Sequence, residues 1–311
     1  MGSEILTWRT LVGAIHGPIR KGVTALLLLF ATGPTSAELP IVVQDDTGIK
    51  LVLSTPAKRI ITLSPHLTEY LFHLGVDDQI VGAVEYSNYP AKAKLIPRIG
   101  SHQKFNLEAI IALGPDLALA WHSGNPTSEL TRIDRLGIPI FRSEPRQLKH
   151  IANTLRRLGR LTGVEDRGHR LAKMFLADAS TLKKQYNGRS PMRVFYQVWQ
   201  DPLMTLNGKH LVSRLIRHCG GVNIFEHVDL LAPTVSREAV IGADPEIIIA
   251  AAPASMAHDW LISWRRWSGL RAVKNKHLFT IDPDLINRAT PRILTGMQTL
   301  CELIQRARSG Q

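Results

Sequence analysis

One stretch of this sequence occurs twice in similar form, and the repetition constrains the fold more than any other feature. "NLEAIIALGPDLALA" spans residues 106–120, and "SREAVIGADPEIIIA" spans residues 236–250. In each copy an acidic residue, Glu108 or Glu238, opens an apolar segment, a proline interrupts it, and a short aliphatic run follows. Each copy fits a short helix that starts near its glutamate and leads into a buried strand. The chain is therefore expected to contain two similar α/β halves.

Strand and helix patterns alternate on both sides of each copy. Runs typical of short buried strands are "RIITLSP", "QIVGAVEY", "DLALAWH" and "GIPIF" in the first half, and "RVFYQV", "EIIIAAA" and "LFTID" in the second. Segments with helical spacing lie between them, such as "HLTEYLFHLG", which ends at Gly75. A hairpin-like lead, "IVVQDDTGIKLVLS", precedes the first run. This alternation predicts an α/β fold with parallel sheets and crossover helices.

The pattern changes between the two halves. Apolar residues recur at helical spacing from residue 147 onward, and Gly159 and Gly163 separate two helical segments. We interpret this region as a rigid connector. The predicted organisation is an N-terminal lobe over residues 38–146, a helical connector over 147–189 and a C-terminal lobe over 190–311.

Residues 1–37 have the pattern of a secretory signal. Arg20 and Lys21 precede "GVTALLLLFATGPTSA", an apolar run that ends in small residues. A membrane anchor is the alternative, but the apolar core is well short of the roughly 20 residues that a spanning helix needs. No cysteine lies near the expected cut, which argues against a lipid anchor. We expect export, with cleavage after about Ala37.

Charge and cysteine content narrow the functional classes. The net charge is +12, but the basic residues are scattered and no aromatic-interleaved motif accompanies them, so a solvated basic surface is favoured over nucleic-acid binding. The sequence has two cysteines, Cys219 and Cys301. An exported protein with an even cysteine count usually pairs them, and two separate buried thiols are the alternative.

Catalytic signatures are absent from the sequence. It contains no G-x-S-x-G elbow, Walker A loop, G-x-G-x-x-G or H-E-x-x-H motif, and its 12 histidines show no ligand-like clustering with carboxylates. We assign no catalytic residue and expect no enzyme. A secreted α/β hydrolase or metal enzyme remains the rival from a different class.

Several motifs, in order and spacing, resemble one family of transport proteins. "RIITLSPHLTEYLFHLG", "YSNYP", "NLEAIIALGPDLALAW", "CGGVNIF", "VSREAVI" and "RATPRI" resemble the periplasmic cobalamin-binding proteins of bacterial vitamin B12 importers. More broadly, the chain looks like the helical-backbone class of substrate-binding proteins, which also serves haem and iron–siderophore import. The resemblance covers nearly the whole chain after the signal segment.

The resemblance implies an architecture and a function. It implies two α/β lobes with central parallel sheets, joined by a long backbone helix, with a ligand cleft between the lobes. The implied protein is a periplasmic monomer that has no cofactor, captures cobalamin or a related tetrapyrrole and delivers it to an ABC importer permease. In the family one glutamate per lobe docks on permease arginines, and Glu108 and Glu238 fall on those positions. Cys219 and Cys301 fall where the family places its disulfide.

The resemblance also implies cleft residues. Tyr86 and Trp121 match aromatic positions that line the pocket, and Asp284 and Arg288 match a polar pair that meets the ligand's peripheral groups. Trp121 as an ordinary core residue, and Arg288 as a structural partner of Asp284, are the alternatives.

Three positions depart from the cobalamin pattern. His102 and Ala232 each replace a tryptophan, and Met204 replaces a phenylalanine, so we expect a wider cleft and leave haem or an iron–siderophore as alternative ligands. His102 is expected either to form a polar wall or to supply an axial nitrogen to the metal of a bound corrinoid or haem. No other metal ligand is predicted.

Overall fold

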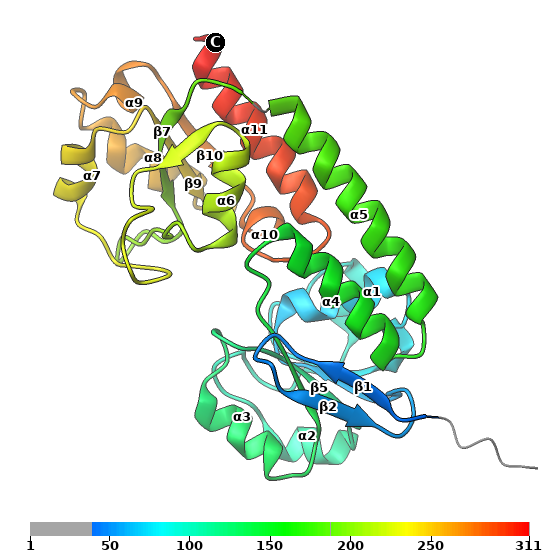
Figure 1. Ribbon diagram of the computed structural model, residues 1–311. Helices are drawn as coiled ribbons and strands as arrows, with labels where there is room; N and C mark the ends of the chain where they lie inside the picture. Colours follow the sequence, from blue (N-terminus) through cyan, green and yellow to red (C-terminus); the bar gives the residue numbers. More distant parts are fainter. Residues whose placement is uncertain (1–38, 187, 311) are drawn as a thin grey trace, which may run out of the picture. The chain divides into compact units, whose positions relative to one another are not determined.

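The computed structural model describes residues 39–186 and 188–310 (Figure 1). The expected signal segment, residues 1–37, lies outside them. Within the described ranges, every helix is too short or too polar to cross a membrane.

The N-terminal lobe contains a four-stranded parallel sheet. Its strand order is β4 (Ile80–Ala83), β3 (Ile60–Thr62), β5 (Leu117–Trp121) and β6 (Ile140–Ser143). Neighbouring residues along these strands face opposite sides of the sheet, and both sides are buried, so Ile60 packs in one apolar cluster and Ile61 in another. The expected hairpin is confirmed as β1 (Ile41–Gln44) paired antiparallel with β2 (Lys50–Leu53).

The C-terminal lobe repeats this plan. Its parallel sheet has the order β10 (Leu278–Ile281), β9 (Ile247–Ala251), β7 (Met192–Gln197) and β8 (Gly221–Asn223). The two copies of the repeated stretch thus lead into β5 and β9, which are interior strands of the two sheets. The predicted α/β class with two lobes and two parallel sheets is confirmed. Sequence patterns missed β8, which begins within the stretch that was expected to be helical.

Helices connect the strands in both lobes. The first lobe contains α1 (Pro65–Leu74), which ends at Gly75 as expected, α2 (Leu107–Leu113), α3 (Thr127–Asp134) and the 3₁₀ turns η1 (Asp77–Gln79) and η2 (Ala91–Leu95). The second contains α6 (Leu211–His218), α7 (Arg237–Ala243), α8 (Ala257–Arg265), α9 (Arg271–Lys274), α10 (Pro283–Ile286) and α11 (Ile293–Ser309).

Two packed helices form the connection between the lobes. They are α4 (Leu148–Leu161) and the long α5 (Glu165–Tyr186), and Figure 1 shows α5 running beside α11 of the second lobe. Gly163 ends the first helix with a φ of +79°, which glycine adopts without steric cost. A Cβ at Gly159 would lie 3.0 Å from the Cα of Gly168, so these glycines allow the two helices to pack closely. One continuous apolar cluster extends from the first sheet through both helices into the second.

A buried carboxylate joins the lobes a second time. The side chain of Glu69 on α1 is 3% exposed, and it accepts hydrogen bonds from Arg292 Nε at 2.9 Å and Arg288 Nη1 at 2.8 Å. Beside it, the Tyr70 hydroxyl donates to the Ala289 carbonyl at 2.8 Å. Helix α1 of the first lobe is therefore bonded to the segment that precedes α11 in the second.

The disulfide between Cys219 and Cys301 is confirmed. Both residues are fully buried, their Cα atoms lie 4.7 Å apart, and they are separated by 82 positions in the sequence. The bond connects the C-terminal end of α6 to α11. It closes a loop that includes most of the second lobe.

Removing this bond should weaken the fold. Replacing both cysteines by alanine (C219A/C301A) should lower the free energy of unfolding by about 4 kcal/mol, because the unfolded chain regains the entropy of a long open loop. Urea denaturation followed by circular dichroism measures the change. The native protein unfolded with a reductant should lose a similar amount. Equal denaturation midpoints for the oxidised protein and the double variant would contradict the prediction.

Candidate ligand-binding site

A cavity of about 260 Å³ lies between the two lobes. Parallel sheets present their carboxyl-terminal strand ends to bound ligands, and this cavity follows that rule. Lining residues of the first lobe follow β3, β4, β5 and β6 in the chain, and those of the second come from the start of α6, from Leu231 and from the segment of α10. The lining includes Ser64, His66, Tyr86, His102, Trp121, Glu144, Arg146, His210, Arg288 and Ala289.

Trp121, at the end of β5, is the largest aromatic group of the cavity wall. The ring of His66 meets it edge-on with centroids 5.8 Å apart, and the ring of His102 is tilted against it at 6.4 Å. Tyr86 stands at the mouth with 74% of its surface exposed and a φ of +62°, which is uncommon for a residue with a side chain. Three positions predicted from sequence, Tyr86, His102 and Trp121, therefore lie together.

Two residues that sequence reasoning missed hold this wall in place. The Asn125 side chain is buried, accepts from the Trp121 amide at 2.7 Å and donates to the carbonyls of Leu63 and His102. A Cβ at Gly124 would lie 1.8 Å from the Trp121 ring, so only glycine lets the indole lie against the backbone there. Asn125 thus connects the ends of two strands to the His102 loop.

The histidines of the cavity differ in their hydrogen bonds. His210, the N-cap of α6, accepts the Val212 amide at Nδ1, 3.1 Å away. His66 has its Nδ1 2.6 Å from the Ser64 hydroxyl, and its buried Nε2 has no partner among the residues that the structure describes. No hydrogen bond involves a ring nitrogen of His102 within residues 39–186 and 188–310. Nor does that part of the chain bring three histidine, cysteine or acidic side chains together as a metal site would require.

Burial keeps two of these rings neutral. Desolvation, followed by the nearby charge of Arg288, lowers the pKa of His66 to about 3. Desolvation, followed by the charge of Arg146, lowers the pKa of His210 to about 4. At neutral pH both side chains are therefore uncharged.

Arg288 lines the cavity, and both of its terminal nitrogens already bond protein acceptors. Its Nη1 donates to Glu69 and Asn88, and its Nη2 bonds Asp284 at 2.8 Å and the Tyr86 carbonyl at 3.3 Å. The Asp284–Arg288 pair that sequence suggested is thus present. Asp284 itself is not among the residues that line the cavity.

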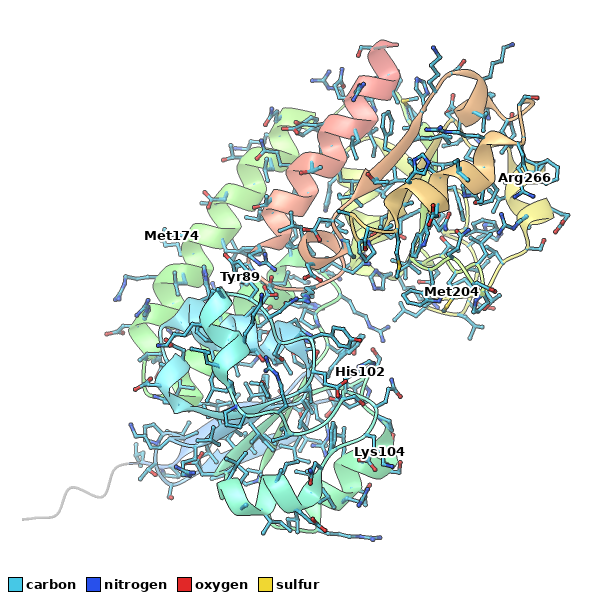
Figure 2. The ribbon with its side chains drawn as sticks, turned by 180° about the vertical axis from the view of Figure 1, so that it is seen from behind. Tyr89, His102, Lys104, Met174, Met204 and Arg266 are labelled. Atoms are coloured by element: carbon cyan, nitrogen blue, oxygen red, sulfur yellow. A yellow bond between two sulfur atoms is a disulfide. The ribbon has the colours of Figure 1, made fainter. Side chains whose placement is uncertain are left out.

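Met204 and Ala232 also lie outside the cavity lining. Met204 forms isolated backbone bridges to Trp199 and Thr234 in the second lobe, on the opposite lobe from His102 (Figure 2). Ala232 is exposed, directly after Leu231, which does line the cavity.

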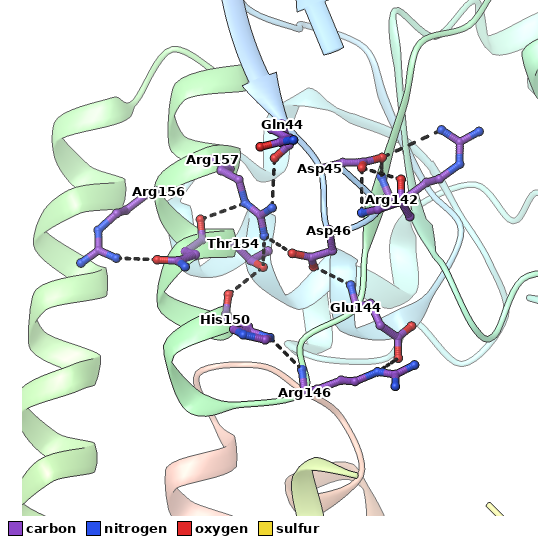
Figure 3. Close-up of polar contacts among 12 residues, drawn as sticks. Gln44, Asp45, Asp46, Arg142, Glu144, Arg146, His150, Thr154, Arg156 and Arg157 are labelled. Atoms are coloured by element: carbon purple, nitrogen blue, oxygen red, sulfur yellow. Dashed lines mark hydrogen bonds and ion pairs between the residues drawn. The ribbon is translucent and has the colours of Figure 1, made fainter. Parts of the chain in front are cut away.

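A polar network connects the cavity rim to the connector (Figure 3). The Asp46 carboxylate bonds Arg157 of α4 at 2.6 Å and the Glu144 amide at 2.6 Å, and Glu144 in turn pairs with Arg146 at 3.3 Å. Glu144 also accepts from the Ser123 amide at 3.0 Å. The charges of Glu144 and Arg146 at the rim therefore balance each other.

The two repeated helices are held by equivalent contacts. At their N-termini, the side chains of Asn106 and Ser236 accept the amides of Ala109 and Ala239 at 3.0 and 3.1 Å. At their C-termini, the final carbonyls of Leu113 and Ala243 each accept a guanidinium N–H at 2.6 Å. The donors are Arg59 for α2 and Arg193 for α7.

The two copies of the repeat share one more pair of equivalent contacts, just after each helix. Asp116 and Glu246, at equivalent places in the repeat, accept the backbone amides of Arg59 and Arg193 at 3.0 and 2.8 Å. Each helix is thus tied to the start of a strand of its own sheet, β3 for α2 and β7 for α7. Glu108 and Glu238 lie in the first turns and are exposed.

Comparisons with known proteins agree with this architecture. A family model of periplasmic binding proteins matches residues 60–285. The vitamin B12-binding protein of Vibrio parahaemolyticus is 36% identical over 248 residues, which are 79% of this chain and 89% of that relative.

Solved structures of periplasmic binding proteins also have a similar fold. The periplasmic vitamin B12 binding protein of Vibrio cholerae matches with a TM-score of 0.76 and 35% identity, covering 81% of this chain and 98% of that one. A periplasmic heme-binding protein from Roseiflexus matches with a TM-score of 0.73 at 22% identity, over 82% and 100% of the two chains, and supports the fold alone. The chain belongs to the periplasmic binding protein family.

Proposed function

We propose that this protein captures a cobalamin-like corrinoid in the periplasm and delivers it to an ABC importer without chemical turnover. The observation that carries the proposal is the inter-lobe cavity, which combines a flat aromatic wall around Trp121 with polar groups that carry no unbalanced charge. Large ligands with apolar faces and a polar edge need such a mixture. The names of the 36% identical relatives support the same ligand class.

The charges that line the cavity favour a cobalamin-like corrinoid over haem or an iron–siderophore. The charged residues among those that line the cavity are Glu144, Arg146 and Arg288, and each pairs with an opposite charge of the protein. A carboxylate brought into such a site would find no free cation, and an unpaired buried charge is costly. The amide-fringed edge of a corrinoid therefore fits better than the carboxylates of haem or the anionic groups of a siderophore.

The cavity must widen when such a ligand enters. Its volume of about 260 Å³ lies below the range of roughly 300–1,000 Å³ that is typical of small-molecule sites. A corrin macrocycle is larger still, so the wall side chains or the lobes must move apart. Two parts of the proposal rest on the sequence alone: export with loss of residues 1–37 follows from the pattern of that segment, and the monomeric state follows from the family resemblance.

Ligand selectivity provides the first test. The purified protein should bind cyanocobalamin and cobinamide at least tenfold more tightly than haem, because only haem brings uncompensated carboxylates into the cleft. Isothermal titration calorimetry with the four probes cyanocobalamin, cobinamide, haem and a ferric siderophore measures the order. Tighter binding of haem or the siderophore would reverse the assignment within the same family.

The two exposed glutamates are proposed as docking groups for the permease. Each lies on a helix that is braced at both ends, and carboxylates in fixed positions can form directed, charge-assisted bonds with arginines of a partner. This geometry offers one contact per lobe, which would orient the cleft over the transport pathway.

A double variant tests the docking role. E108A/E238A should bind corrinoid as the native protein does but should lose at least tenfold in affinity for the reconstituted permease. The matched control is E165A/E302A, which removes two exposed glutamates from α5 and α11. Pull-down and uptake assays provide the readout. Native uptake by E108A/E238A would exclude the docking role.

His102 is proposed as an axial ligand for corrinoids that have an open metal position. A neutral imidazole is a good ligand for cobalt, and the ring nitrogens of His102 make no hydrogen bond to the described residues that would have to break first.

The visible spectrum tests this role. Bound aquocobinamide should show a spectrum shifted from that of the free corrinoid, and H102A should abolish the shift, while H122A, a change at an exposed histidine outside the cavity lining, should retain it. A spectrum that is identical with and without His102 would limit this residue to forming the wall.

A further inference from the structure

Two histidines on opposite lobes line the cavity with the same ring nitrogen already engaged. For His210 the assignment is direct, because Nδ1 accepts the Val212 amide and must keep its lone pair. The proton of the neutral ring therefore resides on Nε2. No group among the described residues bonds this Nε2–H.

For His66 the assignment follows from counting donors and acceptors. If Nδ1–H donated to Ser64, the serine hydroxyl and the Nε2 lone pair would both lack a partner, since the Ser64 side chain makes no other hydrogen bond within the described ranges. If Ser64 donates to Nδ1, only Nε2–H is left open. Ser64 and His66 are each more than 90% buried, and unsatisfied buried groups cost free energy. The second arrangement, with Ser64 donating to Nδ1, is therefore the stable one.

The open donor of His66 indicates a missing partner. The great majority of buried polar atoms in folded proteins have hydrogen bonds, and exceptions require an explanation. His66 lines the cavity next to Trp121 and Arg288, and its Nε2 is covered from solvent, so a ligand reaches this nitrogen when the cavity widens to admit it. Because the ring remains neutral at physiological pH, it offers a donor without a charge.

We propose that the Nε2–H groups of His66 and His210 are paired donors, one from each lobe, for carbonyl oxygens of amide groups on the ligand's edge. The proposal rests on the proposed function and makes it more specific. Two neutral donors suit neutral acceptors, and closing the cleft on such a ligand would bond it to both lobes together. Neither histidine can then be an axial metal ligand, because its Nε2 carries the proton.

Asparagine substitutions test what each Nε2–H donor contributes to binding. In H66N and H210N the side-chain oxygen can replace Nδ1 as acceptor for Ser64 or for the Val212 amide, while the Nε2–H is lost. In H66Q and H210Q the amide nitrogen can reach the place of Nε2 and keep the donor. Calorimetry with cyanocobalamin should show a loss on the order of tenfold in affinity for each asparagine variant, about one hydrogen bond, and a smaller loss for each glutamine variant. H122N is the control and should bind as the native protein does.

Nitrogen-15 spectra of selectively labelled histidine test the tautomers without any ligand. His66 and His210 should both be protonated at Nε2, and cyanocobalamin should shift these resonances on binding. A proton on Nδ1 of either residue would overturn the proposal, as would native affinity in H66N and H210N with the folds intact. If no corrinoid binds the native protein at all, the proposed function fails, and the spectra still decide whether the two donors exist.

Discussion

The buried carboxylate of Glu69 is the contact on which the arrangement of the cleft depends. A charge with only 3% of its side chain exposed is stable only when it is paired and hydrogen-bonded, and both of its partners, Arg288 and Arg292, come from the other lobe. Arg292 also lies over the Tyr89 ring, 3.5 Å from its centroid. Among the described residues Glu69 is the one carboxylate that pairs with Arg292, whereas Arg288 also pairs with Asp284, so removing Glu69 would leave Arg292 without an anionic partner between the lobes. The double pairing of Glu69 keeps α1 and the segment before α11 joined at the edge of the cavity.

Much of the fold could be predicted because the chain repeats its plan and most of its strands are buried on both faces. Such strands give continuous apolar runs, as "EIIIAAA" does for β9, and the leucines of α4 recur at helical spacing. The elements that sequence reasoning missed are mostly short. β8 has three residues, and α9 and α10 have four each, too few for any periodic pattern. The boundaries proposed at residues 146 and 189 place each sheet within one lobe and stay a prediction.

The candidate site was less predictable, because its residues meet only after folding. Tyr86, His102 and Trp121 could be suggested from a resemblance, and the structure brings them to one wall. His66 and His210 gave no local signal, since a histidine near the start of a helix is ordinary until its buried ring is found beside a cavity. The role of Arg288 depends on Glu69, more than 200 positions away, and no local pattern reveals such a pair. The rule that ligands gather at the carboxyl ends of parallel strands would have indicated the segments, though not the side chains.

The equivalent bracing of α2 and α7 has a mechanical consequence. Arg59 and Arg193 fasten the last turn of each helix to the start of a strand in its own sheet, so each helix moves with its lobe as a rigid part. The span between the two exposed glutamates can then change only when the lobes themselves move. The distance between Glu108 and Glu238 therefore depends on how far the cleft is open. A surface that bound both glutamates at a fixed spacing would select one degree of opening over the others.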